Sequence, residues 1–140
     1  MNHLVGLDIG GANIKVAHSD GECRAQSFPL WKSPEKLAET LAGLIRDWLP
    51  CSGIAVTMTG ELADCFETKA EGVDKILKAV EKAADRTPIS VWHTVGEFVD
   101  APTAREFWQL TAASNWHALA TFVGRVAPEG TALLLDIGST

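Results

Sequence analysis

Two short segments, near the two ends of the chain, place an aspartate, a glycine and small or hydroxyl residues directly after an apolar run. Residues 4–11 read LVGLDIGG, and residues 133–140 read LLLDIGST. Glycine lets the backbone approach an anion closely, and successive backbone amides can bind phosphate oxygens. An aspartate beside such a loop can hold Mg²⁺ next to the phosphates, usually through water. The repeated pattern therefore predicts a two-part site for a phosphate ester and magnesium.

Each segment supplies specific candidates. Asp8 and Asp136 are the predicted metal ligands, and Asp8 is also a candidate catalytic residue. The predicted phosphate-binding residues are Gly10, Gly11, Ala12, Asn13 and Lys15 in the first segment, and Gly138, Ser139 and Thr140 in the second. The alternative interpretation is two ordinary glycine turns that bind nothing. It would not explain why each strand carries an aspartate at the same register, because burial of an unpaired carboxylate is costly and such a group usually has a cation or a hydrogen-bond partner. Lys15 alone is more typical of a solvated lysine, and only its place near the loop favours phosphate binding.

Three further polar residues are candidates with open alternatives. Glu61 and Asp64, in the segment MTGELAD, are candidate general bases, but they also suit a capped helix start or a solvated loop. Asn115 lies on an otherwise apolar helix face, where a buried amide needs partners. It is predicted to form a hydrogen bond between domains or to contact the substrate.

The composition excludes several classes of protein. The chain has 140 residues, of which 46% are hydrophobic, so it can form a packed core. Its net charge of -6 argues against a nucleic acid or an anionic membrane as the main partner. Three scattered cysteines fit reduced thiols better than a disulfide framework or a zinc site. With no signal peptide and no spanning segment in the sequence, we expect a cytoplasmic protein.

The elements that must position these residues follow from periodicity and turn signals. A three-stranded antiparallel meander is predicted first, with a tight turn at Asp20–Gly21, and parallel strands with flanking helices extend it. The predicted strands are residues 4–9, 14–18, 23–28, 53–57, 89–92 and 131–137. Helices are expected over residues 33–49 and 72–84, followed by one long helix over residues 104–126. Thr103 and Glu106 are its predicted capping box.

At the two aspartate-glycine segments, the sequence resembles the actin, sugar kinase and heat-shock ATPase superfamily. GLDIGGANIKVA (residues 6–17) resembles its first phosphate hairpin and LLLDIGST its second, which implies a ribonuclease-H-like α/β fold. VTMTGELADCFETKAEGVDKIL (residues 56–77) and AASNWHALATFVGR (residues 112–125) resemble the hydantoinase/oxoprolinase group, specifically its short branch linked to one-carbon metabolism. The resemblance implies a first domain over residues 1–130 and the opening strand of a second over residues 131–140.

For that branch, the resemblance implies a transferase that completes the side chain of methanofuran. It joins an aminomethyl-furanmethyl diphosphate to the phenol of γ-glutamyltyramine and releases pyrophosphate, with Mg²⁺ as the implied cofactor. Two alternatives stay open: an ATP-dependent amidohydrolase or sugar kinase of the same superfamily, and a non-catalytic module that needs a partner chain. Since the second hairpin is incomplete at Thr140, we expect these residues alone to be catalytically silent. We expect them to self-associate or to bind a complementary C-terminal half.

Overall fold

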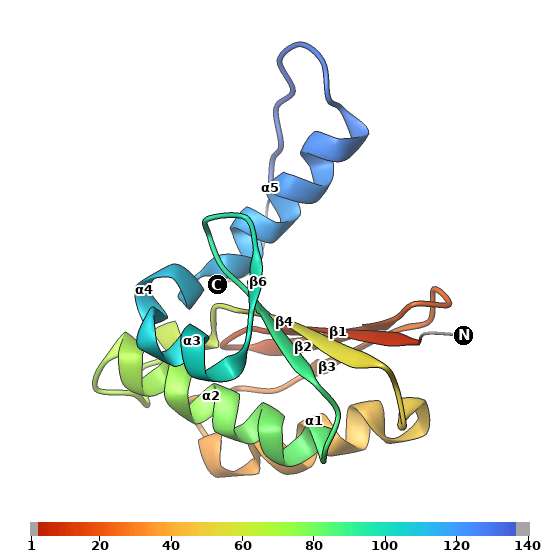
Figure 1. Cartoon of the computed structure of the whole chain (residues 1–140). Coiled ribbons are helices and arrows are strands. Elements are labelled where there is room, and N and C mark those ends of the chain that lie inside the picture. The colour runs from red at the N-terminus through yellow and green to blue at the C-terminus, as the bar shows by residue number, and fades with distance from the viewer. Residues whose placement is uncertain (1–2, 137–140) are drawn as a thin grey trace.

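The computed structural model describes residues 3–136, which form a mixed α/β sheet with flanking helices, as predicted (Figure 1). The six strands lie in the order β3-β2-β1-β4-β5-β6. Their bounds are Leu4–Ile9 (β1), Asn13–His18 (β2), Cys23–Ser27 (β3), Gly53–Met58 (β4), Ile89–Trp92 (β5) and Phe98–Val99 (β6). The short strand β6 was not predicted, because two residues are too few to show a periodic pattern.

The pairing of the strands brings the first hairpin to the middle of the sheet. β1 pairs antiparallel with β2, and β2 pairs antiparallel with β3. β4 runs parallel to both β1 and β5, and β6 returns antiparallel to β5. Gly21, in the turn between β2 and β3, has a φ of 100°, which a residue with a side chain rarely adopts. The carboxyl ends of β1 and β4 therefore lie side by side in the centre of the sheet.

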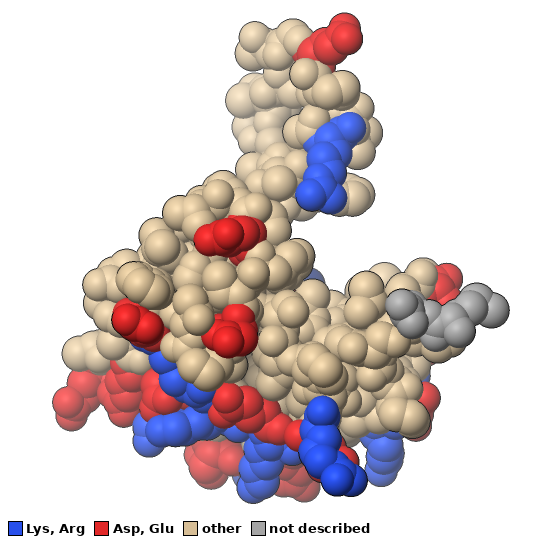
Figure 2. Space-filling model, viewed as in Figure 1, with Lys and Arg blue, Asp and Glu red and all other residues tan. Residues whose placement is uncertain are grey.

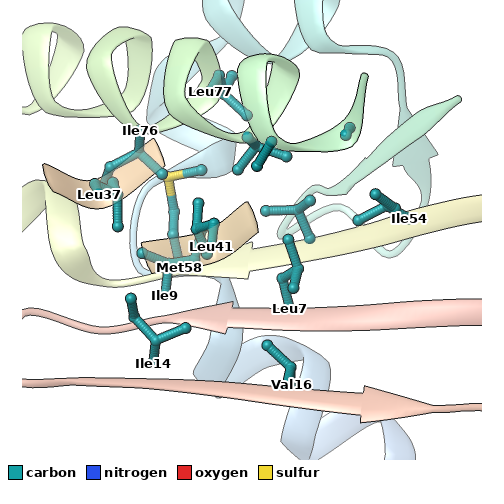
Figure 3. Close-up of a cluster of buried hydrophobic side chains, with 14 of the residues drawn as sticks. Leu7, Ile9, Ile14, Val16, Leu37, Leu41, Ile54, Met58, Ile76 and Leu77 are labelled. Carbon is teal, nitrogen blue, oxygen red and sulfur yellow. The ribbon is translucent and has the colours of Figure 1, made fainter. Parts of the chain in front are cut away.

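Two helices cover one face of the sheet and enclose the core. α1 (Leu37–Ile45) and α2 (Lys69–Ala84) lie on this face (Figure 1), and short 3₁₀ turns flank α1. α2 begins three residues earlier than predicted because the Thr68 side chain accepts a hydrogen bond from the Glu71 amide. Alternate residues of the strands point toward these helices (Figure 3). Fully buried core side chains include Val5, Ile9, Ile14, Leu41, Ile54, Val56, Met58, Ile76 and Leu77.

The opposite face of the sheet is lined by small residues. Gly6 of β1, Ala17 of β2 and Ala55 of β4 line a groove of about 550 Å³ there. Asp8 and Lys15 lie in the same groove. Charged side chains gather over the helical side of the molecule in the view of Figure 2, whereas the surface above the sheet in that view is mostly uncharged.

The prediction of one continuous helix over residues 104–126 is wrong. It is divided into α3 (Ala101–Glu106), α4 (Trp108–Thr111) and α5 (Ser114–Val126). The cap is Asp100, whose carboxylate accepts a hydrogen bond from the Thr103 amide, so the predicted capping box does not form. The second break lies at Ala113, whose φ of 52° is left-handed and cannot continue a helix.

The last helix also differs from the prediction in its burial. α5 projects away from the sheet (Figure 1), and near its start His117 accepts a hydrogen bond of 3.1 Å from the Trp92 indole. Along the helix, Trp116 is 67% exposed and Phe122 is 63% exposed. Apolar residues around most of a helix favour burial on several sides, and the structure does not show such burial of α5.

Residues 131–136 follow α5 as an exposed, irregular segment. No strand is assigned to them, although a strand was predicted from residue 131, because a strand requires a hydrogen-bonded neighbour. Within residues 3–136, no helix combines the length and the apolar character needed to cross a membrane.

Candidate functional site

The first predicted hairpin places Asp8 and Lys15 opposite each other. The two residues are direct partners in the antiparallel register of β1 and β2. Lys15 Nζ lies 3.7 Å from Asp8 Oδ2, and both side chains are in contact with solvent. Thr57 of β4, which the sequence analysis did not select, places its hydroxyl 3.4 Å from Asp8 Oδ1. A carboxylate, an ammonium group and a hydroxyl therefore meet on the open face, at the end of β1.

The loop that joins β1 to β2 offers fewer free amides than the sequence predicts. The Gly10 amide donates to the Asn13 carbonyl at 3.0 Å, so the turn itself uses this group. A Cβ atom at Gly10 would lie 3.0 Å from the same carbonyl, which explains the glycine. Among the described residues, the amides of Gly11 and Ala12 have no acceptor. These two amides are the ones that can receive an anion without breaking a hydrogen bond.

Two neighbouring segments are held against this loop by backbone hydrogen bonds. The Leu30 amide donates to the Gly11 carbonyl and the Phe28 amide to the Ala12 carbonyl, each at 2.8 Å. On the other side, the Thr59 amide donates to the Ile9 carbonyl at 3.0 Å. The loop of the hairpin is therefore fixed between the segment after β3 and the segment after β4.

Asp64 lies in a hollow beside the hairpin loop. The hollow has a volume of about 200 Å³, and its lining residues are Gly11, Trp31, Thr59, Leu62, Ala63 and Asp64. The side chain of Asp64 is exposed, so a bound molecule can reach its carboxylate. The structure thus brings one of the two predicted bases next to the predicted phosphate loop. Trp31 was missed by the sequence analysis, since a single aromatic residue in a loop carries no periodic signal.

Glu61, the other predicted base, is in the interior. Only 2% of the residue is exposed, and Oε1 accepts a hydrogen bond of 2.8 Å from the Ala113 amide. Oε2 is buried and has no partner among the described residues. Burial raises the pKa of the Glu61 carboxyl above its usual range, because loss of water disfavours the charged form. The geometry ties Glu61 to the break between α4 and α5, away from an open surface.

Asn115 lies two residues after that break. Its Oδ1 atom and the Ser114 hydroxyl are both buried without a partner in the described part of the chain. The oxygen of the Asn115 amide is therefore buried, as its place on an apolar helix face suggested. Whether Asn115 contacts a substrate or a second domain stays a prediction.

Of the second predicted motif, the structure describes residues 133–136. Asp136 is exposed in the irregular segment after α5. Gly138, Ser139 and Thr140 lie outside the described residues, so their phosphate-binding role stays a prediction. Asp8 and Asp136 are not joined by an interaction among the described residues.

The donors around Asp8 are compatible with magnesium held in its usual way. Residues 3–136 contain no group of three or more His, Cys, Asp or Glu side chains placed to hold a metal ion. Mg²⁺ does not need such a group, since it keeps several waters and binds one or two carboxylates together with phosphate oxygens. Asp8, which is partly exposed beside two free amides, fits this mode of binding. The described residues do not fit a site in which protein side chains supply all the metal ligands.

Comparisons with known proteins agree with the resemblance seen in the sequence. The sequence model of the hydantoinase/oxoprolinase family matches residues 52–140. A curated protein of Methanocaldococcus jannaschii, (4-{4-[2-(gamma-L-glutamylamino)ethyl]phenoxymethyl}furan-2-yl)methanamine synthase, is 36% identical over 140 residues. The matched region covers 98% of this chain and 41% of that relative. The chain therefore spans less than half of the relative's length.

Proposed function

Because the chain belongs to the hydantoinase/oxoprolinase family, we propose that it forms the diphosphate-binding part of a transferase in methanofuran biosynthesis. The relative's name describes a synthase whose product carries a phenoxymethyl group on a furan ring. The proposed reaction makes such a link from an aminomethyl-furanmethyl diphosphate and the phenol of γ-glutamyltyramine. The chain's similarity to that synthase, along nearly its whole length, supports this choice of substrates.

The proposed chemistry is a substitution at the furanmethyl carbon. The bond between this carbon and the diphosphate oxygen breaks, and its electron pair leaves with pyrophosphate. The phenol oxygen forms the new bond to the same carbon, and the phenol proton passes to a carboxylate base. Charge develops mainly on the leaving group, so groups that stabilise the diphosphate oxygens accelerate the reaction most.

The observation that carries the proposal is the pairing of Asp8 and Lys15 beside the free amides of Gly11 and Ala12. Lys15 and the two amides would contact diphosphate oxygens, which leaves the turn hydrogen bond of Gly10 intact. Asp8 would hold Mg²⁺, which supplies positive charge to the leaving group when it is bound. Asp64 is the proposed base, because it is exposed in the adjoining hollow, whereas Glu61 is buried and bonded to Ala113.

We also propose that the mixed sheet is a ribonuclease-H-like domain over residues 1–130 and that a second domain begins at residue 131. The sheet order and the antiparallel pairing of the first three strands support the fold. Exposed apolar side chains on α5 and at Leu133–Leu135 support a contact with further protein, either a C-terminal half or a second copy. Asp136, Gly138, Ser139 and Thr140 would then complete the phosphate site.

A second candidate function follows from the same family. Hydantoinase and oxoprolinase relatives suggest an ATP-dependent amidohydrolase, and the resemblance of the hairpin to sugar kinases suggests a phosphotransferase. Both alternatives require ATP at the site that the first proposal gives to a diphosphate ester.

Product formation distinguishes these candidates. The chain, together with the further protein proposed to complete its phosphate site, is incubated with Mg²⁺, the furanmethyl diphosphate and γ-glutamyltyramine, once with ATP and once without it. Pyrophosphate, ATP hydrolysis and the ether product are measured together. We expect equal amounts of both products without ATP. Hydrolysis of ATP with no ether product would support the second candidate and contradict the first.

A further inference from the structure

An exposed tryptophan stands beside the phosphate loop. Trp31 is 49% exposed and lines the hollow with Gly11, whereas Phe28 and Leu30, in the same segment, are buried. Leu62, which also lines the hollow, is 48% exposed. Large apolar side chains left open to water next to a polar loop indicate a surface that binds an apolar group.

The position of Trp31 is fixed by the chain around it. The Leu30 amide is bonded to the Gly11 carbonyl, and the Lys32 amide donates to the Pro29 carbonyl at 2.9 Å, so Trp31 lies in a closed turn. Leu30 is in turn packed against Gly60, where a Cβ atom would lie 2.9 Å from Leu30 Cδ2. The backbone of Trp31 is therefore anchored to the phosphate loop through Leu30 and held in the turn through Lys32, so it needs little ordering when a ligand binds.

We propose that Trp31 binds the aromatic ring that the diphosphate substrate carries, and thereby selects aromatic over aliphatic diphosphate esters. This inference rests on the proposed function, because it assumes that the diphosphate lies on the amides of Gly11 and Ala12. A ring joined to the diphosphate through one carbon then reaches the hollow that Gly11 itself lines. Aromatic rings gain stability by stacking beyond the area they bury, and Leu62 supplies an apolar wall.

The charges around the hollow agree with this placement. Lys15 and the free amides lie on the hairpin side, and the described residues of the hollow include one charged group, Asp64. A diphosphate is repelled by that carboxylate and attracted to the hairpin, so the ring and not the phosphate is the part that suits the hollow.

Calorimetric titration with three probes in the presence of Mg²⁺ tests the inference. The probes are pyrophosphate, methyl diphosphate and benzyl diphosphate, and the proteins are the unmodified chain, Trp31→Ala, Trp31→Phe and the control Trp116→Ala. Trp116 is also an exposed tryptophan, but it lies on α5. Circular dichroism checks that every variant is folded.

We expect the unmodified chain to bind benzyl diphosphate about tenfold more tightly than methyl diphosphate, within the range that ring stacking and burial supply. Trp31→Ala should remove this preference and leave the affinity for pyrophosphate unchanged, while Trp31→Phe and Trp116→Ala should keep it. A preference that persists in Trp31→Ala, or an equal loss for all three probes, would overturn the inference and leave the proposed function intact. Failure of the unmodified chain to bind any of the probes would instead overturn the proposed function, and the inference with it.

Discussion

Replacement of Glu61 should separate its structural role from a catalytic one. Glu61 accepts a hydrogen bond from Ala113, a residue 52 positions away whose left-handed backbone ends α4 and starts α5. Glu61→Ala removes the acceptor and leaves a partly buried amide without a partner. Glu61→Gln has the same shape, keeps an acceptor oxygen and cannot ionise.

The size of the effect follows from the hydrogen bond that is lost. A buried donor left without a partner costs about 1–3 kcal/mol. We therefore expect Glu61→Ala to be less stable than Glu61→Gln by about 1–3 kcal/mol. For a domain of this size, each kcal/mol lowers the melting temperature by roughly 4 °C. Glu61→Gln itself should be at least as stable as the unmodified chain at pH 8, because it removes the cost of a buried charge.

Urea unfolding followed by circular dichroism measures these differences, and hydrogen exchange at the Ala113 amide reports on the bond itself. Glu39→Ala, at an exposed position on α1, is the matched control and should change stability by less than about 0.5 kcal/mol. The Ala113 amide should exchange faster in Glu61→Ala than in Glu61→Gln. Equal stability of the two Glu61 variants, with equal exchange at Ala113, would refute the role given to this carboxyl.

Three other predictions concern pH, the thiols and the C-terminal segment. Burial raises the pKa of Glu61 above its ordinary value of 4.5, so the folded chain holds a proton that the unfolded chain releases. The free energy of unfolding should therefore fall as pH rises from about 4.5 through the folded pKa, and this fall should be smaller in Glu61→Gln. Equal pH dependence in the two proteins would contradict a raised pKa for Glu61. All three cysteines are free in the structure, so thiol titration after denaturation without reductant should count three, and stoichiometric zinc in the purified protein would contradict the cysteine interpretation. Deletion of residues 131–140, which include the exposed Leu133–Leu135, should make the chain more monomeric by light scattering without unfolding the sheet; unchanged association would place the contact elsewhere.

Local sequence signals predicted the elements of the sheet well. Continuous apolar residues indicated β1 and β4, and Asp20–Gly21 indicated the turn between β2 and β3, because these features depend on residues close in the chain. The register that pairs Asp8 with Lys15 was not predicted, because it depends on the loop between β1 and β2, where the Gly10 amide donates to the Asn13 carbonyl.

The break between α4 and α5 could not be predicted in the same way. The sequence near Ala113 has no glycine or proline, and at the break the Ala113 amide donates a hydrogen bond to Glu61, which is distant in the sequence. α2 passes so close to that loop that a Cβ atom at Gly72 would lie 2.7 Å from Glu61 Cα. Long-range packing of this kind leaves no periodic signal, and for the same reason the sequence could not distinguish a buried Glu61 from an exposed Asp64.

The central claim is that the hairpin of Asp8 and Lys15 binds a diphosphate with magnesium. Titration calorimetry with pyrophosphate, with and without Mg²⁺, measures this directly in the unmodified chain and in Asp8→Asn. We predict binding that depends on Mg²⁺, with a stabilisation of about 2.7 kcal/mol at a ligand concentration one hundred times the Kd. We predict that Asp8→Asn loses this binding and keeps its unliganded melting temperature, because Asp8 is partly exposed and outside the apolar core. Equal Mg²⁺-dependent affinity in Asp8→Asn and the unmodified chain would contradict the account.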